Sequence, residues 1–132
     1  MNRTSAIIMG VATAFSLAAC GNEYGSPDLD YRVIGVRGVV RDAAQAPVSG
    51  AAVTLAAYLL SCSGGLDGSA STQTGADGRF VTVLGGSPLS QPRCVRVTAT
   101  KGGVSGTAVS STVVFPVRVP RDTIDINVVL GN

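Results

Sequence analysis

Apolar and polar residues alternate along most of the chain beyond residue 31. A repeat of two is typical of β-strands, whose side chains point in turn to a core and to solvent. In the clearest case Val95, Val97 and Ala99 occupy the inward face, and the residues between them are polar. The pattern predicts six strands, at residues 33–41, 53–60, 80–84, 94–100, 107–115 and 124–130.

The segments between these strands carry turn residues. The sequence PVSG at residues 47–50 marks one connection, and Asp77-Gly78 is a tight-turn signal because Gly tolerates positive φ. Residues 61–75 are rich in Gly and Ser and poor in apolar residues, so we expect a long surface loop there. Short strands separated by turns predict one all-β domain, a β-sandwich, over residues 32–132.

The first 20 residues have a different character. Arg3 gives a positive start, and residues 6–15 form an apolar stretch too short to span a bilayer comfortably. The sequence LAAC at residues 17–20 resembles the lipobox of bacterial lipoproteins. That resemblance implies cleavage between Ala19 and Cys20 and acylation of the Cys20 thiol. A plain secretory leader with an incidental Cys is the alternative.

The leader predicts three parts in the chain: a signal peptide at residues 1–19, an acylated, flexible tether at 20–31, and the domain. Three acyl chains would hold the domain at a membrane essentially permanently. Gly21, where some lipoproteins have Asp, favours the outer membrane if the organism has two membranes. The expected location is therefore the cell envelope, with the membrane as the first partner.

Three segments together contain, in order, a Gly-x-Val strand, a Pro-Val-x-Gly-Ala turn, a Val-x-Leu strand and a Thr-x-x-Asp-Gly-x-Phe turn. They read GVRGVVRD at 35–42, PVSGAAVTL at 47–55 and TQTGADGRF at 72–80. This pattern resembles the carboxypeptidase regulatory-like domain, a transthyretin-like β-sandwich with Greek-key topology. Bacterial members are modules of surface proteins and not the peptidase, so the resemblance speaks for fold more than function. The motif residues that it implies are Pro47, Gly50, Asp77, Gly78 and Phe80.

Two cysteines, Cys62 and Cys94, lie beyond the leader. An even pair in an exported chain favours a disulfide, which would stabilise the fold by roughly 3 to 4 kcal/mol in the chain-entropy model. Two buried free thiols are the alternative. Two thiols without a His make a poor zinc site, and we expect neither a metal nor a cofactor.

The absence of His removes serine triads, Cys–His dyads and most zinc catalysis. We therefore expect no catalytic residue and a protein that is not an enzyme, while Asp67 and Asp77 keep a cryptic hydrolase as an alternative. The net charge of +2 comes without a basic run, so nucleic acid binding has no electrostatic support. The Arg residues are assigned to a solvated sheet face.

These patterns predict a non-catalytic binding or structural module whose partner is an envelope protein or a glycan. Edge strands of the sandwich offer pairing sites for another strand. A carbohydrate or envelope-polymer binder is the second hypothesis, with Tyr58 as the sugar platform and Asp67 as a further contact. A half-buried strand Tyr is the competing interpretation of Tyr58.

Overall fold

The computed structural model describes residues 32–115 and 122–131. The predicted cleavage and acylation at Ala19 and Cys20, and everything else predicted for residues 1–31, lie outside the described residues. Within the described part of the chain, no helix is long and apolar enough to cross a membrane.

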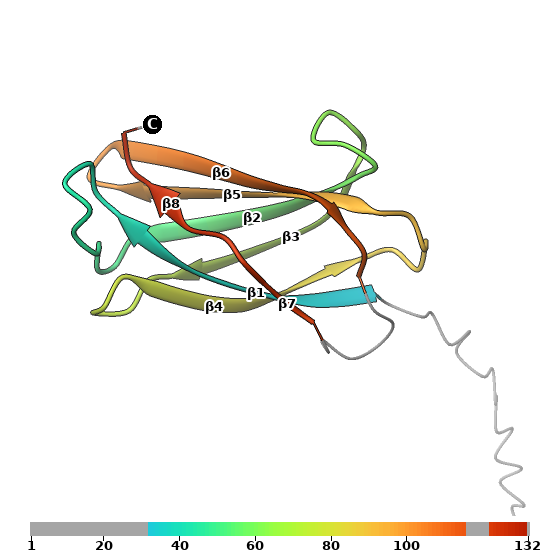
Figure 1. Cartoon of the computed structure of the whole chain (residues 1–132), viewed down its shortest axis with the longest axis horizontal. Helices are drawn as coiled ribbons and strands as arrows, with labels where there is room; N and C mark the ends of the chain where they lie inside the picture. The colour runs from blue at the N-terminus through green and yellow to red at the C-terminus, as the bar shows by residue number, and fades with distance from the viewer. Residues whose placement is uncertain (1–31, 116–121, 132) are drawn as a thin grey trace, which may run out of the picture.

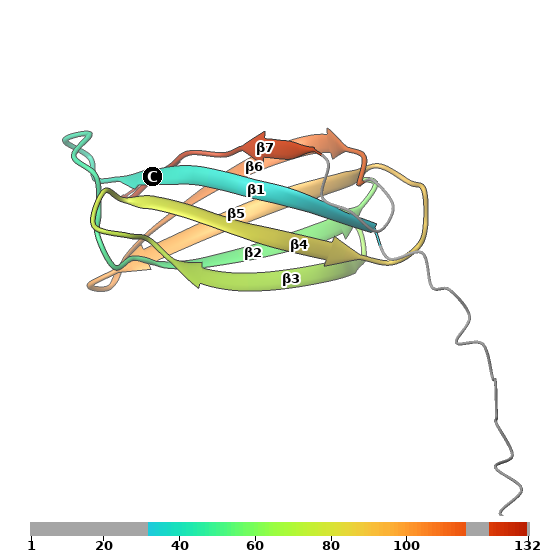
Figure 2. The same ribbon diagram turned by 90° about the horizontal axis from the view of Figure 1, so that it is seen from below.

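The described residues form two four-stranded sheets. In the first, β1 lies between β4 and β7 and also pairs with β8; the second has the order β3-β2-β5-β6. Figures 1 and 2 show the sheets stacked face to face, and the predicted all-β sandwich is confirmed. The strands are β1 (Arg32–Arg41), β2 (Ala52–Leu59), β3 (Leu66–Gln73), β4 (Arg79–Gly86), β5 (Arg93–Lys101), β6 (Val104–Val113), β7 (Thr123–Asp125) and β8 (Val128–Val129).

The core is formed by the inward rows of the predicted alternation. Along β5, Val95, Val97 and Ala99 are fully buried, and the residues between them are partly exposed. The pattern recurs in β1, β2 and β4, because side chains in a strand point alternately to its two faces. The largest fully buried apolar side chains are Phe115, Ile34, Leu55, Leu84, Val36, Val40, Val53, Val95, Val97 and Val128.

The expected long loop at residues 61–75 is wrong, because most of it is strand β3, paired antiparallel with β2. β3 is an edge strand rich in Ser, Thr and Gly, and its only fully buried side chain is that of Asp67. It lacks the apolar rows that reveal the other strands, although its residues alternate between half-buried and exposed. Backbone pairing with β2 holds it in place.

The expected single strand at residues 124–130 is divided into β7 and β8, which both run parallel to β1. Between them the Ile126 N–H donates to the Arg37 carbonyl oxygen at 2.9 Å. The Asn127 side chain accepts from the Val39 N–H at 3.0 Å and so replaces a backbone acceptor. The inward row of this segment keeps its predicted burial at Ile126, Val128 and Leu130.

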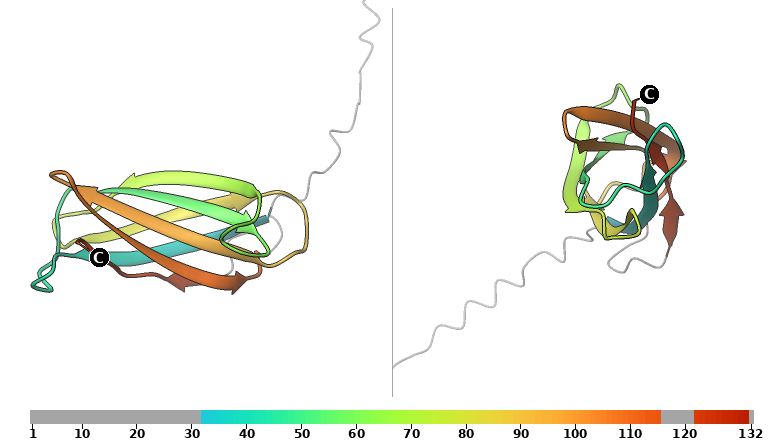
Figure 3. Two further views of the ribbon diagram at one scale, coloured as in Figure 1. Left: turned by 90° about the horizontal axis from the view of Figure 1, so that it is seen from above. Right: turned by 90° about the vertical axis from the view of Figure 1, so that its left-hand side faces the viewer.

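The two sheets approach each other along both long edges of the sandwich (Figure 3), and a glycine lies at each close approach. A Cβ on Gly68 in β3 would collide with the carbonyl of Gly85 in β4. On the other side, a Cβ on Gly106 in β6 would collide with the carbonyl of Val129 in β8. These contacts cover the sheet edges, which are otherwise open to pairing with other chains.

The turn motif occupies one end of the sandwich, which we call the far end because β1 ends there. Gly50 and Gly78 have φ of 64° and 72°, in the left-handed region that favours Gly. The buried Thr74 hydroxyl donates to the Val48 carbonyl at 2.6 Å and accepts from the Ala51 N–H at 2.8 Å. Pro47 forms an isolated bridge with Arg41, Asp77 accepts from the Arg79 N–H, and Phe80 packs in the core.

We expect Gly68→Ala to destabilise the fold by roughly 1 to 3 kcal/mol, because its methyl group would force β3 away from β4. Gly65→Ala is the matched control, since a Cβ there meets nothing within 4 Å. Urea unfolding of both variants measures the difference. Equal stability of the two variants would show that the edge contact does not constrain the sandwich.

Candidate functional site

The near end of the sandwich, where β1 begins, contains a buried ion pair. The Arg93 side chain is 0% exposed and that of Asp67 is 4% exposed. The Arg93 Nε donates to the Asp67 Oδ2 at 2.6 Å, which links β5 to β3. The structure thus places Asp67, expected on a loop as a ligand contact, in an internal contact.

The loop between β4 and β5, residues 87–92, wraps around the Arg93 guanidinium. Its Nη2 donates to the Ser87 and Leu89 carbonyls at 2.8 and 3.1 Å, and its Nη1 donates to the Gln91 carbonyl at 3.0 Å. The guanidinium also lies over the Phe115 ring, 4.8 Å from its centroid. Every buried polar side-chain atom in the described residues has a hydrogen-bond partner.

The assignment of all Arg residues to a solvated face is therefore wrong for Arg93. A signal was present in the sequence, because Arg93 precedes Val95 and Val97 in the inward row of β5. An Arg in such a row requires a buried partner, since an unpaired charge in a core is costly. The partner could not be identified while Asp67 was assigned to a loop.

Burial raises the pKa of Asp67, but hydrogen bonds from Ser87 and Arg93, together with the Arg93 charge, outweigh it. The resulting pKa of Asp67 lies below its ordinary value. The carboxylate is therefore ionised at neutral pH and is committed to Arg93. The ion pair stabilises the contact between β3 and β5, and it leaves Asp67 poorly placed to act as a general acid.

The two carboxylates of the alternative hydrolase are not brought together. Asp67 lies at the near end, at the start of β3, whereas Asp77 lies in the turn after β3 at the far end. Asp67 is the second residue of the 8-residue strand β3, so most of the strand's length, roughly 20 Å, separates the two carboxylates. Across the described residues, no group of three His, Cys, Asp or Glu side chains is placed to hold a metal ion.

Tyr58, the expected sugar platform, is half-buried near the end of β2. The Arg96 guanidinium lies 5.0 Å from its ring centroid and covers one face of the ring. The same guanidinium donates to the Cys62 carbonyl at 3.1 Å. Cys62 and Cys94 form the expected disulfide, with a Cα–Cα distance of 5.1 Å, so the loop beside Tyr58 is fixed to β5.

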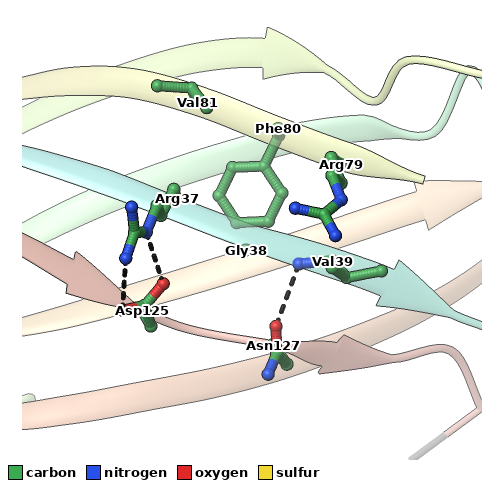
Figure 4. A pocket seen from close by; sticks show the side chains of 8 residues that line it. All are labelled: Arg37, Gly38, Val39, Arg79, Phe80, Val81, Asp125 and Asn127. Carbon is green, nitrogen blue, oxygen red and sulfur yellow. Dashed lines mark hydrogen bonds and ion pairs between the residues drawn. The ribbon is translucent and has the colours of Figure 1, made fainter. Parts of the chain in front are cut away.

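The outer face of the β4-β1-β7 sheet carries an open pocket of about 320 Å³ (Figure 4). The strand register sets Val81, Arg37 and Asp125 in one row across three strands. The Arg37 Nε donates to the Asp125 Oδ1 at 2.6 Å, and its Nη2 donates to the Asp125 Oδ2 at 3.3 Å. The pocket is lined by Arg37, Gly38, Val39, Arg79, Phe80, Val81, Asp125 and Asn127.

Both cations of this pocket have an exposed carboxylate beside them. The hydrogen bond from Arg37 and its charge lower the pKa of Asp125, and the same pairing raises the pKa of Arg37. Arg79 lies 3.5 Å from Asp77 in a looser, solvated pair. Exposed pairs of this kind contribute little to stability. A partner can therefore exchange for either carboxylate at small cost to the fold.

No protein-family model matches this chain, and no curated protein sequence matches it either. Among solved structures it is similar to a chlorocatechol 1,2-dioxygenase from Pseudomonas putida, with 15% identity and a TM-score of 0.50. The match covers 78% of this chain and 62% of the dioxygenase, so this chain spans less than two thirds of that protein's length.

Two further structures match at lower scores. A 3-chlorocatechol 1,2-dioxygenase from Rhodococcus opacus 1CP has 13% identity and a TM-score of 0.46, covering 79% of this chain and 62% of that one. An alternative pilotin from the type II secretion system of Vibrio cholerae has 11% identity and a TM-score of 0.45, covering 76% and 99%. These scores are too low to support an argument about this chain.

The prediction that the chain is not an enzyme is contradicted by the dioxygenase match. A sandwich of this kind forms part of an enzyme, so the fold gives no ground for excluding catalysis. The physical reason is that activity is determined by the residues placed on a fold and not by the fold itself. At 15% identity the likeness shows the fold alone and assigns no reaction to this chain.

We expect Asp67→Asn to lower the free energy of unfolding at pH 7 by about 3 kcal/mol, because Arg93 would be left buried without its counter-charge. A lowered pKa contributes stability at neutral pH that is lost as the pH falls through it. The difference between Asp67→Asn and the unmodified protein should therefore shrink below about pH 4.

Urea unfolding at a series of pH values tests this prediction. Asp125→Asn, which breaks the exposed pair, is the matched control and should change stability far less. Equal stability of Asp67→Asn and the unmodified protein at pH 7 would contradict the importance of the buried pair.

Proposed function

We propose that this chain is a lipid-anchored protein of the cell envelope whose sandwich binds a partner protein through the outer face of the β4-β1-β7 sheet. The lipobox-like sequence ending at Cys20 and the disulfide between Cys62 and Cys94 support an extracytoplasmic location. The resemblance to carboxypeptidase regulatory-like domains supports a modular role. In an organism with two membranes, Gly21 favours anchoring in the outer membrane.

The observation that carries this proposal is the pair of exposed valines on the outer face of β4. Val81 is 72% exposed and Val83 is 51% exposed, and both lie in the outward row of β4, where Val81 pairs with Arg37 and Val83 with Gly35 of β1. Apolar side chains next to a charged, pocketed face are typical of protein-binding surfaces. The fold itself does not require either valine, since the core lies on the opposite face.

The glycan hypothesis receives less support. Stacking on a sugar needs a free aromatic face, and Arg96 already covers one face of the half-buried Tyr58. Asp67, the second expected contact, is buried against Arg93.

Anchoring predicts that Cys20→Ala shifts the protein from the membrane fraction to the soluble envelope fraction, because the thioether to lipid cannot form. Fractionation and the intact mass of the mature chain measure this shift. A Cys20→Ala protein that stays in the membrane fraction to the same extent as the unmodified protein would contradict the proposed anchor.

The proposed surface predicts that a photocrosslinking residue at Val81 captures one specific protein from native envelopes. The same residue at Val109, a valine on β6 that is 58% exposed, is the matched control and should not capture that protein. Val81→Lys should weaken recovery of the partner by at least about ten-fold if Val81 is a hot spot, whereas Val109→Lys should not. Equal capture from both positions would exclude the outer face of β4 as the specific surface.

A further inference from the structure

Exposed large apolar side chains gather at the near end of the sandwich. Figure 1 shows that the start of β1, the β2–β3 loop, the β4–β5 loop and the end of β6 all lie at this end. The strand register also places these segments at one end, because Arg32 pairs with Gly86, and Arg93 pairs with both Leu59 and Val113. Leu60 and Leu66 flank the β2–β3 loop, Leu89 lies within the β4–β5 loop, and Val114 follows β6. Their exposed fractions are 63%, 64%, 47% and 56%. We call these four residues the apolar rim.

One rim residue is held in an unfavourable backbone conformation. Leu60 has φ of 65°, in the left-handed region that Gly and Asn adopt far more easily than Leu. Its N–H donates to the Pro92 carbonyl at 2.9 Å, so the conformation is fixed by the β4–β5 loop. A solvated loop would gain stability from Gly or Asn here. The position therefore presents an apolar side chain to the outside at a cost to the fold.

Hydrogen bonds and the disulfide fix the loops that carry the apolar rim. The Arg93 guanidinium binds the Leu89 carbonyl, and Arg32 donates to the Pro88 and Phe115 carbonyls at 2.9 and 3.0 Å. The disulfide fixes the β2–β3 loop to β5. The side chains of Arg93 and Asp67 are directed inward to each other, so this ion pair adds no charge to the outward surface.

The length of chain between Cys20 and the domain limits how far the near end can lie from a lipid surface that holds Cys20. The 12 residues at 20–31 reach at most about 40 Å when fully extended. They join the domain at Arg32, the first residue of β1, and β1 then leads away from that point for 10 residues, or about 33 Å. A lipid surface holding Cys20 is thus always within reach of the near end.

We propose that the apolar rim rests on the lipid surface in which Cys20 is anchored and orients the sandwich with its strands pointing away from the membrane. The inference depends on the proposed lipid anchor. The occupant is the apolar upper layer of a phospholipid bilayer, and no partner protein is required at this end. Leucines at loop tips insert shallowly into such a layer, as the apolar faces of interfacial helices do.

The native chain contains no Trp, so a single introduced Trp reports its own surroundings. Mature, acylated Leu89→Trp and Val104→Trp proteins are reconstituted in vesicles of phosphatidylethanolamine and phosphatidylglycerol with brominated acyl chains. Val104 is the matched control, because it is equally exposed but lies at the far end. We expect the bromines to quench Leu89→Trp emission and to leave Val104→Trp emission unchanged.

The outcomes separate the rim from the anchor. Protein that floats with the vesicles but shows equal or no quenching at the two positions overturns the rim while the anchor stands. Protein that does not float overturns the anchor and, with it, the inference. Leu60→Asn in the Leu89→Trp background should raise the urea midpoint yet reduce the quenching, since Asn suits φ of 65° but does not enter lipid. Undiminished quenching there would remove Leu60 from the lipid contact.

Discussion

The buried guanidinium of Arg93 determines how the near end of the sandwich is built. A charge without solvent must be neutralised and its N–H groups must be satisfied, and this protein does so with Asp67 and a ring of backbone carbonyls. Those acceptors come from β3 and from the β4–β5 loop. The loop therefore cannot move independently of the core, although it is largely exposed. A loop secured from inside needs few apolar residues of its own for packing, and Leu89 is left outside.

The same contact explains why small residues surround it. A Cβ on Gly86 would collide with the Asp67 carboxylate and crowd the Arg93 Nε, so only Gly leaves room for the pair. Close by, Gly68 lets β3 approach β4 and covers an edge that would otherwise be open. Gly68, which the sequence analysis counted as part of a Gly-rich loop, is thus required for tight packing between two strands.

The sequence predicted the strands that have an apolar inward row but missed β3. Period-two alternation located β1, β2, β4 and β5, because burial selects for apolar residues. The strand that corresponds to β6 was predicted from the turn residues that bound it, Gly102-Gly103 and Pro116. β3 is held by backbone hydrogen bonds to β2, and its sequence has no row of apolar residues that would reveal it. The orientation of Arg37 and Val81 was readable as outward, but their adjacency was not, because cross-strand register depends on contacts distant in sequence. The pairing of Asp67 with Arg93 was hidden for the same reason.

The proposed lipid contact at the apolar rim and the proposed partner contact on the β4-β1-β7 sheet can form at the same time. The apolar rim lies at the end of the strands, whereas Val81 and Arg37 lie on a sheet face that runs parallel to them. If the near end rests on lipid, this face stands roughly perpendicular to the membrane and remains open to a partner approaching along its plane. On these two proposals the strands would hold the sheet face away from the membrane, and the apolar rim would resist tilting. Attachment through residues 20–31 alone would leave the orientation free, so the rim would give the proposed binding face a defined direction.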